Sequence, residues 1–275
     1  MKPHFIRSKI ERLDGIPTIP QVVRQLLTTI EGDRLSFKDL GEMISRDQAV
    51  TARLLKMVNS PVYGFPGRIS SVPQALILLG LHVVKGVLLG VSVFEIMERA
   101  MVGLWNHSLF TALVAREIAV KKGLSEPEEV MTSALLHDIG KVALKVNFTA
   151  EYNRALALSQ ERDLLIKDAE EEVFSLSHSM AGGWLTRKWN FPITLSEPIA
   201  YHHKPALAKH APLHTAIVHV ADILVRARGI GFGGDDLVPP LDAAVWRDLS
   251  LSESDVRDIL QTVEDMSHDS MSVSL

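Results

Sequence analysis

The chain has 275 residues, a formal net charge of −4 at pH 7 and a pI near 6.3, with 47% hydrophobic and 23% charged residues. This length allows one large domain or two smaller ones. Because the sequence has no basic excess, we expect no nucleic-acid partner. It contains no cysteine, which excludes disulfides, thiolate metal ligands and a cysteine nucleophile within these residues.

The N-terminal stretch MKPHFIRSKIERLDG is charged and has no apolar core, so it does not resemble a signal peptide. The longest apolar run lies around residues 77–94, but His82, Lys85 and several glycines interrupt it. A membrane span needs about 18 or more uninterrupted apolar residues. We therefore expect a buried helix pair here, no membrane segment and a cytoplasmic protein.

Helical patterns follow one another along the first hundred residues. Apolar residues recur at helical spacing in 21–30, QVVRQLLTTI. The segment 59–67, NSPVYGFPG, predicts a loop because it has two prolines and two glycines. A helix that starts after Ser71 is predicted to stop at Gly80, and a long apolar helix then runs to about Arg99.

A second set of helices is predicted after residue 100. We place them at about 101–122, 127–138, 150–161, 168–174, 177–190, 194–203, 212–228, 241–248 and 252–265. GIGFGGDDLVPP is the strongest break in the chain, and no alternating β pattern exceeds a few residues. The predicted fold class is therefore all-α and two-lobed. The predicted parts are an N-terminal helical lobe (1–100), a histidine-rich helical lobe (101–228) and a C-terminal helical extension (229–275).

Seven histidines and aspartates lie in apolar surroundings on five predicted helices or helix ends: His107, His137, Asp138, His178, His202, His203 and Asp222. A polar group on an apolar helix face needs a partner or costs free energy. A divalent cation could satisfy several imidazoles and two carboxylates in one bundle core. The sequence thus predicts a His/carboxylate site for one or two ions. His, Asp and Glu ligands suit zinc, iron, manganese or nickel. Among these we prefer iron, with manganese or zinc possible, although mixed His/carboxylate ligation does not separate them.

The adjacent His137-Asp138 pair suggests a specific chemistry. Neighbours on a helix project about 100° apart and cannot chelate as an i, i+4 pair does, but Asp138 could bridge two metals while His137 ligates one of them. Two metals about 3.5–4 Å apart could activate a water and stabilise a phosphoryl displacement. Lys141, just past a turn predicted at Gly140, could meet the phosphate charge. In this hypothesis Asp138 and Lys141 are catalytic, and Lys141 and His203 contact the substrate.

The histidines also have simpler structural interpretations. A lone buried histidine such as His107 is more often a hydrogen-bonded core residue. His178 follows Ser177 at a predicted helix start and could be an ordinary first-turn residue. His202 and His203 could be the C-terminus of a helix, where positive charge is favourable.

The remaining polar residues have simple interpretations too. Asp222 could cap a helix or pair with Arg226 at i+4. Lys141 could be solvated. His219 lies one turn before Asp222 and is kept only as a residue that could orient a ligand.

The order H…HD…H…HH…D of these residues resembles the HD superfamily of metal-dependent phosphohydrolases. Over about 15–228 the chain resembles an HDOD domain, the HD-related output domain of bacterial signalling proteins. The N-terminal part of the resemblance includes IPTIPQVVRQLL and ISRDQAVTARLLKMVNSPVYGFPGRISSVPQALILLGL. The C-terminal part includes WNHS, LLHDIGK, EEEVFSLSHSMAGGWLTRKWNFP and IAYHHKP.

The resemblance implies an HD-superfamily core preceded by an HDOD-specific helical lobe, and a regulatory role in bacterial signal transduction. Many members are thought to have lost the ligands, whereas this sequence keeps them, in a pattern similar to HD-GYP cyclic-di-GMP phosphodiesterases. It departs from HD-GYP because KPALAKHAP, without Gly-Tyr-Pro, follows His203, and Gly103 stands where three-metal members have Glu. These departures favour at most two metals and argue against cyclic-di-GMP hydrolysis.

The sequence leaves three functional hypotheses. The favoured one is a signalling module that binds a protein partner or a phosphate-containing ligand, with His203 as either a metal ligand or a substrate contact. The alternative is a phosphohydrolase for phosphomonoesters, nucleotides or cyclic dinucleotides. The third is a nucleotide sensor whose metal helps to bind phosphate without turnover. The oligomeric state does not follow from the sequence.

Overall fold

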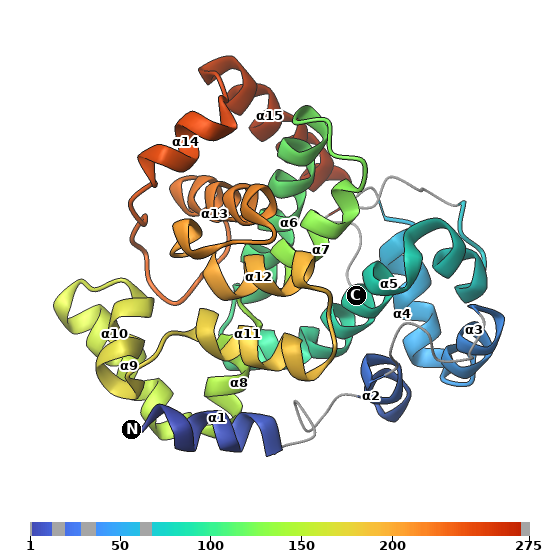
Figure 1. The fold of residues 1–275 in the computed structure, drawn as a ribbon, viewed down its shortest axis with the longest axis horizontal. Coiled ribbons are helices and arrows are strands. Elements are labelled where there is room, and N and C mark those ends of the chain that lie inside the picture. The colour runs from blue at the N-terminus through green and yellow to red at the C-terminus, as the bar shows by residue number, and fades with distance from the viewer. Residues whose placement is uncertain (1, 13–19, 29–36, 61–67, 271–275) are drawn as a thin grey trace. The chain divides into compact units, whose positions relative to one another are not determined.

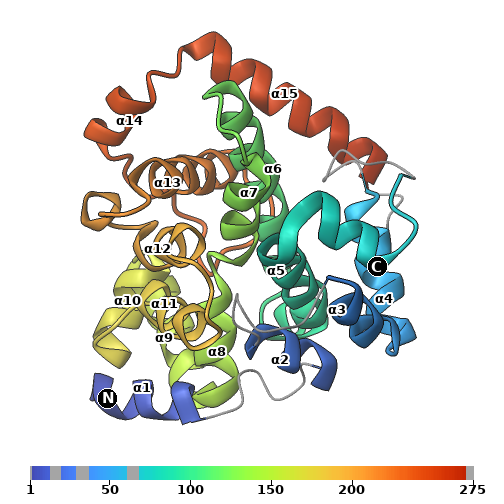
Figure 2. The same cartoon turned by 45° about the vertical axis from the view of Figure 1, so that its right-hand side comes forward.

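The computed structural model describes residues 2–12, 20–28, 37–60 and 68–270. Throughout these ranges the regular elements are helices and there is no strand (Figure 1 and Figure 2). The prediction of an all-α fold is confirmed. Most of the predicted loop at 59–67 lies outside the described residues.

The chain forms two compact units, the first from the described parts of 1–17 and 94–251, the second from those of 18–93 and 252–275. The first unit includes α1 (Pro3–Arg12), which packs on α8 (Ile139–Asn147) and α11 (His178–Lys188). The second includes α15 (Glu253–Ser270). Sequence patterns did not predict that α1 belongs to the first unit or that α15 belongs to the second, because they report local structure and not which helices pack together. The domain ranges 1–100, 101–228 and 229–275 stay a prediction.

The second unit contains α2 (Gln21–Thr28), α3 (Phe37–Ser45), α4 (Gln48–Val58) and most of α5 (Val72–Ala100). Gly80 has φ +77° and ψ 164°, so α5 is two helical parts joined at the break that the sequence predicted. Among the described helices, Val72–Ser92 is long and apolar enough to cross a membrane by length and composition, and 67% of its most apolar window is buried. Core helices of globular proteins have the same properties.

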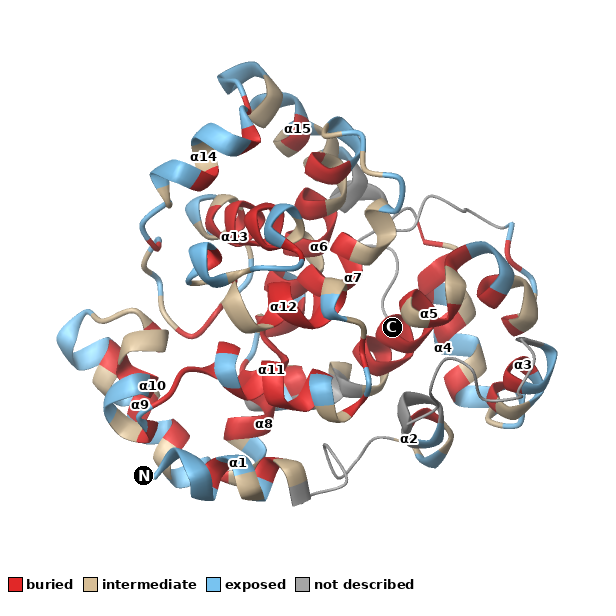
Figure 3. Cartoon of the chain, viewed as in Figure 1, coloured by how far each residue is buried: buried red, intermediate tan, exposed pale blue. Residues whose placement is uncertain are grey.

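The first unit is a bundle built around α6 (Leu104–Lys121), α7 (Pro127–Leu136), α12 (Ile193–Tyr201) and α13 (Pro212–Ala227). In this bundle α6 packs on α7 and α13, and α12 packs on α7, α11 and α13. Residues facing these neighbours are buried (Figure 3). The bundle is completed by α9 (Thr149–Arg162), α10 (Ile166–Phe174), α14 (Ala243–Leu249) and a short 3-10 helix at Pro205–Leu207.

The helix break near the His-Asp pair is not at Gly140, where the sequence predicted it. Helix α7 ends at Leu136, a two-residue turn holds His137 and Asp138, and Gly140 lies inside α8. A Cβ at Gly140 would lie 1.9 Å from the carbonyl oxygen of His178. The glycine is therefore required for close packing of α8 on α11 and not for a turn.

Candidate metal centre

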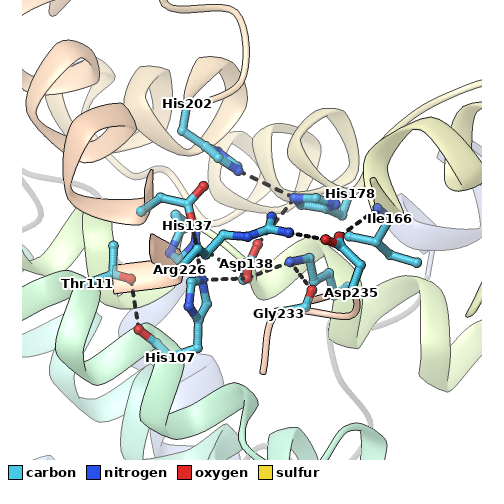
Figure 4. Close-up of polar contacts among 12 residues, drawn as sticks. His107, Thr111, His137, Asp138, Ile166, His178, His202, Arg226, Gly233 and Asp235 are labelled. Atoms are coloured by element: carbon cyan, nitrogen blue, oxygen red, sulfur yellow. Dashed lines mark hydrogen bonds and ion pairs between the residues drawn. The ribbon is translucent and has the colours of Figure 1, made fainter. Parts of the chain in front are cut away.

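The predicted ligands come together within the first unit, from five different segments. Figure 4 shows His107, His137, Asp138, His178 and His202. They lie at the start of α6, in the α7–α8 turn, at the first residue of α11, at the end of α12 and in the middle of α13: His107, His137 and Asp138, His178, His202 and His203, and Asp222. All are buried except His203, which is partly exposed.

His107 is placed by the capped start of α6. Glu98 accepts hydrogen bonds from the backbone N–H groups of Gly103 (3.3 Å) and Trp105 (3.2 Å), which otherwise have no partner within the helix. The hydroxyl of Thr111 donates to the carbonyl oxygen of His107 at 2.8 Å (Figure 4). The imidazole is directed into the bundle, with Nε2 3.2 Å from Asp222 Oδ1.

The turn between α7 and α8 brings the side chains of His137 and Asp138 together. His137 Nε2 lies 3.3 Å from Asp138 Oδ2, and donor atoms of these two residues and His202 lie within 4.8 Å of one another. The two residues lie in the turn after α7 and not on a continuous helix, so the angle of about 100° expected between helix neighbours does not apply to them. Two adjacent ligands can thus serve one ion.

Asp138 lies between two groups of histidines. Its Oδ2 is 3.3 Å from His137 Nε2 and 3.5 Å from His107 Nε2, whereas its Oδ1 is 3.2 Å from His178 Nε2. Donor atoms lie within 4.8 Å of one another in each of two further sets, His107–His137–Asp222 and His178–His202–His203. One carboxylate therefore contacts both sets, as expected of a bridging ligand.

The ring orientations of three histidines are fixed by acceptors at Nδ1. His137 Nδ1 lies 2.6 Å from the carbonyl oxygen of Ala134, and His202 Nδ1 lies 2.9 Å from that of Ile199. The third is His178, whose Nδ1 lies 2.6 Å from a carboxylate oxygen of Glu170. Because a carbonyl only accepts, Nδ1 of His137 and of His202 carries a proton, so the lone pair of the neutral imidazole is at Nε2. These lone pairs face the centre, which is the orientation that metal-ligating histidines require.

Burial and charge set the protonation of the other ligands. Burial lowers the pKa of His107. Burial also holds the pKa of His202 well below its ordinary value, and the charges of His137 and His178 lower it further. Burial alone would raise the pKa of Asp138, but the charges of His137 and Lys141 keep that pKa well below its usual range. The resulting neutral imidazole and ionised carboxylate are the forms that bind a divalent metal.

His178 has the opposite shift. Burial alone would lower its pKa, but the charge of Glu170 raises it above the ordinary value. A proton and a cation therefore compete for His178 Nε2. His203 Nε2 is 3.0 Å from the same atom, and burial together with the charge of His202 lowers the pKa of His203 strongly.

The environment of one buried oxygen of Asp138 fits a divalent cation. Asp138 Oδ1 is fully buried, and its contact with His178 Nε2 at 3.2 Å does not have the geometry of a hydrogen bond, although the oxygen carries part of a negative charge. Such an atom costs free energy unless a cation or donor reaches it. Since nitrogen and carboxylate oxygen atoms converge around it, the donor set suits a divalent metal and not a neutral ligand.

Lys141 is buried, so the interpretation of Lys141 as a solvated residue was wrong. It is 2% exposed, and its ammonium group donates to Asp138 Oδ2 at 2.7 Å and to the carbonyl oxygen of Gly233 at 2.6 Å. The second contact comes from a segment 92 residues later in the chain. Local sequence could not show it.

Asp222 contacts another candidate ligand through its side chain, whereas His219 contacts the backbone of one. Arg226 forms an ion pair with Asp235 and not with Asp222 (Figure 4). Asp222 instead faces His107. His219 does contact a ligand residue: its Nδ1 donates to the carbonyl oxygen of His202 at 2.7 Å. It therefore orients the end of α12.

Glu170 is a site residue that sequence reasoning missed. It is fully buried, and its Oε2 accepts from His178 Nδ1 at 2.6 Å. The neighbouring Glu171 and Glu172 are not buried, and they pair with Lys204 and Arg162 on the surface. Three consecutive glutamates gave no local signal for the buried one.

Comparisons with known proteins agree with this architecture. An HDOD domain protein of unknown function from Geobacter sulfurreducens has a similar structure, with TM-score 0.72, 26% identity and coverage of 97% of this chain and 95% of that chain. A proposed phosphohydrolase from Shewanella amazonensis SB2B has TM-score 0.62 and 17% identity, covering 94% of this chain and 98% of the other. That likeness shows the fold alone.

An uncharacterized protein of Treponema pallidum is 25% identical over 211 residues. The match covers 74% of this chain but only 40% of the Treponema protein. The family model for the HDOD domain matches residues 16–205, which is more than half of the chain. The chain therefore belongs to the HDOD domain family, with an HD-like helical fold whose His/Asp clusters suggest divalent metal binding.

Proposed function

We propose that the chain is a bacterial signal-transduction module, active in the cytoplasm, whose HD-like helices hold one or two divalent metal ions. The observation that carries the proposal is the position of Asp138, whose two oxygens face two separate sets of histidines. In this proposal His107, His137 and Asp222 hold one ion, His178, His202 and His203 hold the other, and Asp138 is shared. Iron is the preferred metal, with manganese or zinc as alternatives.

The signal in this proposal is a phosphate-containing ligand or a protein partner that binds over the centre. A bound divalent metal supplies a Lewis acid that attracts phosphate oxygens. His203 is the partly exposed member of the ligand set, so it is the residue that an incoming ligand meets first. Lys141 contributes a fixed positive charge beside Asp138.

A second candidate is a metal-dependent phosphohydrolase. The observation that favours it is the contact of the Lys141 ammonium with the shared carboxylate, because both groups then lie where a phosphoryl group would be held. In that reaction Lys141 would balance the charge of the phosphate. Asp138 would stay ionised throughout, as its low pKa requires.

The test is the metal content of the purified protein, before and after reconstitution with iron, manganese and zinc. We expect one or two equivalents in the wild type, and a loss in Asp138→Asn, which keeps the side-chain shape but not the charge. Asp168→Asn is the matched control, because Asp168 is a partly exposed carboxylate that pairs with Lys167. Wild-type protein that holds no metal after reconstitution contradicts the proposal.

A substrate screen of the metal-loaded protein separates the two functions. Phosphomonoesters, nucleotides and cyclic dinucleotides are the classes to include. Turnover that Asp138→Asn abolishes supports the phosphohydrolase. Saturable binding of a phosphate compound without turnover supports the signalling module.

A further inference from the structure

The segment after α13 forms part of the candidate metal centre, although the HDOD family model ends at residue 205. We call residues 229–237, GIGFGGDDL, the glycine cover. Gly231 has φ +70° and Gly234 has φ +112°, backbone conformations that L side chains rarely adopt. The cover thus has a shape that depends on its glycines.

The cover lies directly on the first turn of α6. The backbone N–H of Phe232 donates to the carbonyl oxygen of Gly103 at 3.1 Å. A Cβ at Gly231 would lie 2.3 Å from the backbone nitrogen of His107. Only a chain without a side chain at 231 can therefore approach the ligand-bearing turn this closely.

Gly233 lies next to the ligand atoms themselves. Its carbonyl oxygen accepts from Lys141 Nζ at 2.6 Å (Figure 4). A Cβ at Gly233 would be 3.7 Å from His107 Nε2 and 3.6 Å from Lys141 Nζ, which is ordinary van der Waals distance. The cover therefore occupies the space that an incoming group would need beside Lys141 and His107.

A buried ion pair holds the far end of the cover in place. Asp235 pairs with Arg226 of α13, and its Oδ2 accepts from the backbone N–H of Ile166, the first residue of α10, at 2.7 Å (Figure 4). Arg226 also donates to the carbonyl oxygen of Leu237 at 2.6 Å. Both side chains of the pair are almost fully buried. We call Arg226–Asp235 the latch.

The cover also borders a cavity. A cavity of about 450 Å³ is lined there by residues of α9 and the loop after it, including Leu156, Gln160 and Asp163, and by Phe232, Gly234 and Asp236 of the cover. The residues of the cover that line this cavity have free volume beside them into which they can move. The cover is thus built differently from the close-packed α8–α11 contact.

We propose that the glycine cover is a latched closure over the candidate metal centre, and that it must open before a phosphate-containing ligand can reach Lys141. Opening exchanges the Lys141–Gly233 hydrogen bond for a contact between Lys141 and the ligand. The latch sets how often the cover opens. This inference rests on the proposed function for the identity of the ligand, but the movement of the cover can be measured independently.

The experiment measures how fast excess EDTA removes zinc from the reconstituted protein. Asp235→Asn and Arg226→Gln each break the latch but change the net charge in opposite directions. If the latch limits opening, both variants release zinc at least about tenfold faster than wild type, with unchanged stoichiometry. Electrostatics alone would move the two rates in opposite directions, and that result would overturn the proposal. Arg162→Gln is the control, because Arg162 pairs with Glu172 on the surface, and its rate stays within about twofold of wild type.

Hydrogen exchange of the wild-type protein provides a readout that needs no variant and no metal. We expect the amides of Phe232 and Leu237, both hydrogen-bonded, to exchange at least about tenfold faster than those in the middle of α6 and α13. Equal protection of the cover and these helices would overturn the proposal. A protein that binds no metal but shows fast exchange at the cover would contradict the proposed function and leave the closure supported.

Discussion

Glu170 and His178 are joined by two hydrogen bonds. Glu170 Oε2 accepts from the backbone N–H of His178 at 2.7 Å and from its Nδ1 at 2.6 Å, and both residues are fully buried. The first bond holds the first residue of α11 in place, and the second fixes the ring so that Nε2 faces Asp138 Oδ1 at 3.2 Å. One carboxylate thus orients both the backbone and the imidazole of a candidate ligand.

We predict that Glu170→Gln lowers the affinity for divalent metal by about 10–100-fold, because a neutral amide orients the imidazole less firmly and makes it less basic. The measurement is a competition titration against a chromophoric chelator. Glu171→Gln is the matched control, since Glu171 is exposed and pairs only with Lys204 among the contacts described. Its affinity should stay within about twofold of wild type. Equal effects of the two variants would show that Glu170 does not orient a ligand.

Tyr152 supports the same carboxylate from the other side. Its hydroxyl donates to Glu170 Oε1 at 3.0 Å, and burial together with the charge of Glu170 raises the pKa of the phenol well above its ordinary value, so it stays a donor. We predict that Tyr152→Phe lowers the free energy of unfolding by about 1–3 kcal/mol, because a buried carboxylate oxygen loses a donor. Urea denaturation measures this. Tyr201→Phe, at a half-buried position, should change it by less than about 0.5 kcal/mol.

The helices that sequence patterns predicted well have strong boundary signals. Pro127 and Pro212 are the first residues of α7 and α13, as expected from their position in the sequence. Helix α8 was missed because it follows α7 after a turn that contains neither proline nor glycine. Gly140, the residue that suggested a break, is instead required by a neighbouring helix.

The candidate ligands could be predicted because their order along the chain resembles a known family, and the structure brings them together. Their partners could not, because tertiary packing creates the contacts. Lys141 meets a carbonyl from Gly233, far along the chain. Glu170 is buried while Glu171 is exposed, although the two are adjacent and identical in type.

Gly140 provides a test of the close contact between α8 and α11. A Cβ there would lie 1.9 Å from the carbonyl oxygen of His178, so Gly140→Ala forces the helices apart. We predict a loss of about 3 kcal/mol or more in the free energy of unfolding, together with weaker metal binding, because His178 moves with α11. Thermal denaturation and chelator competition measure the two effects.

Gly123→Ala is the control for Gly140→Ala. Gly123 has φ +69°, and a Cβ there meets no atom within 4 Å. The strained backbone alone should cost about 1–2 kcal/mol, and metal affinity should not change. If Gly140→Ala were as stable as Gly123→Ala, the helices would not be in the close contact described.

Glu197 connects α12 to the loop before α13. It is buried, and its carboxylate accepts from three consecutive backbone N–H groups, those of Lys209 (2.9 Å), His210 (2.8 Å) and Ala211. Burial alone would raise the pKa of Glu197, but these hydrogen bonds lower it below the ordinary value of 4.5. The ionised carboxylate therefore stabilises the folded chain.

The lowered pKa fixes how this contribution depends on pH. Since the folded-state pKa lies below the unfolded value, the stabilisation is complete above about pH 4.5 and is lost as the pH falls through the folded pKa. We predict that Glu197→Gln lowers the free energy of unfolding by about 1–3 kcal/mol at pH 7, and that the gap to wild type narrows below pH 4.5. Urea denaturation of both proteins from pH 7 to pH 3 measures the difference in their free energies of unfolding. Because both proteins have the same candidate metal ligands, the titration of those ligands cancels in this difference. A gap that stays constant over this range would mean that the carboxylate is not ionised in the folded chain.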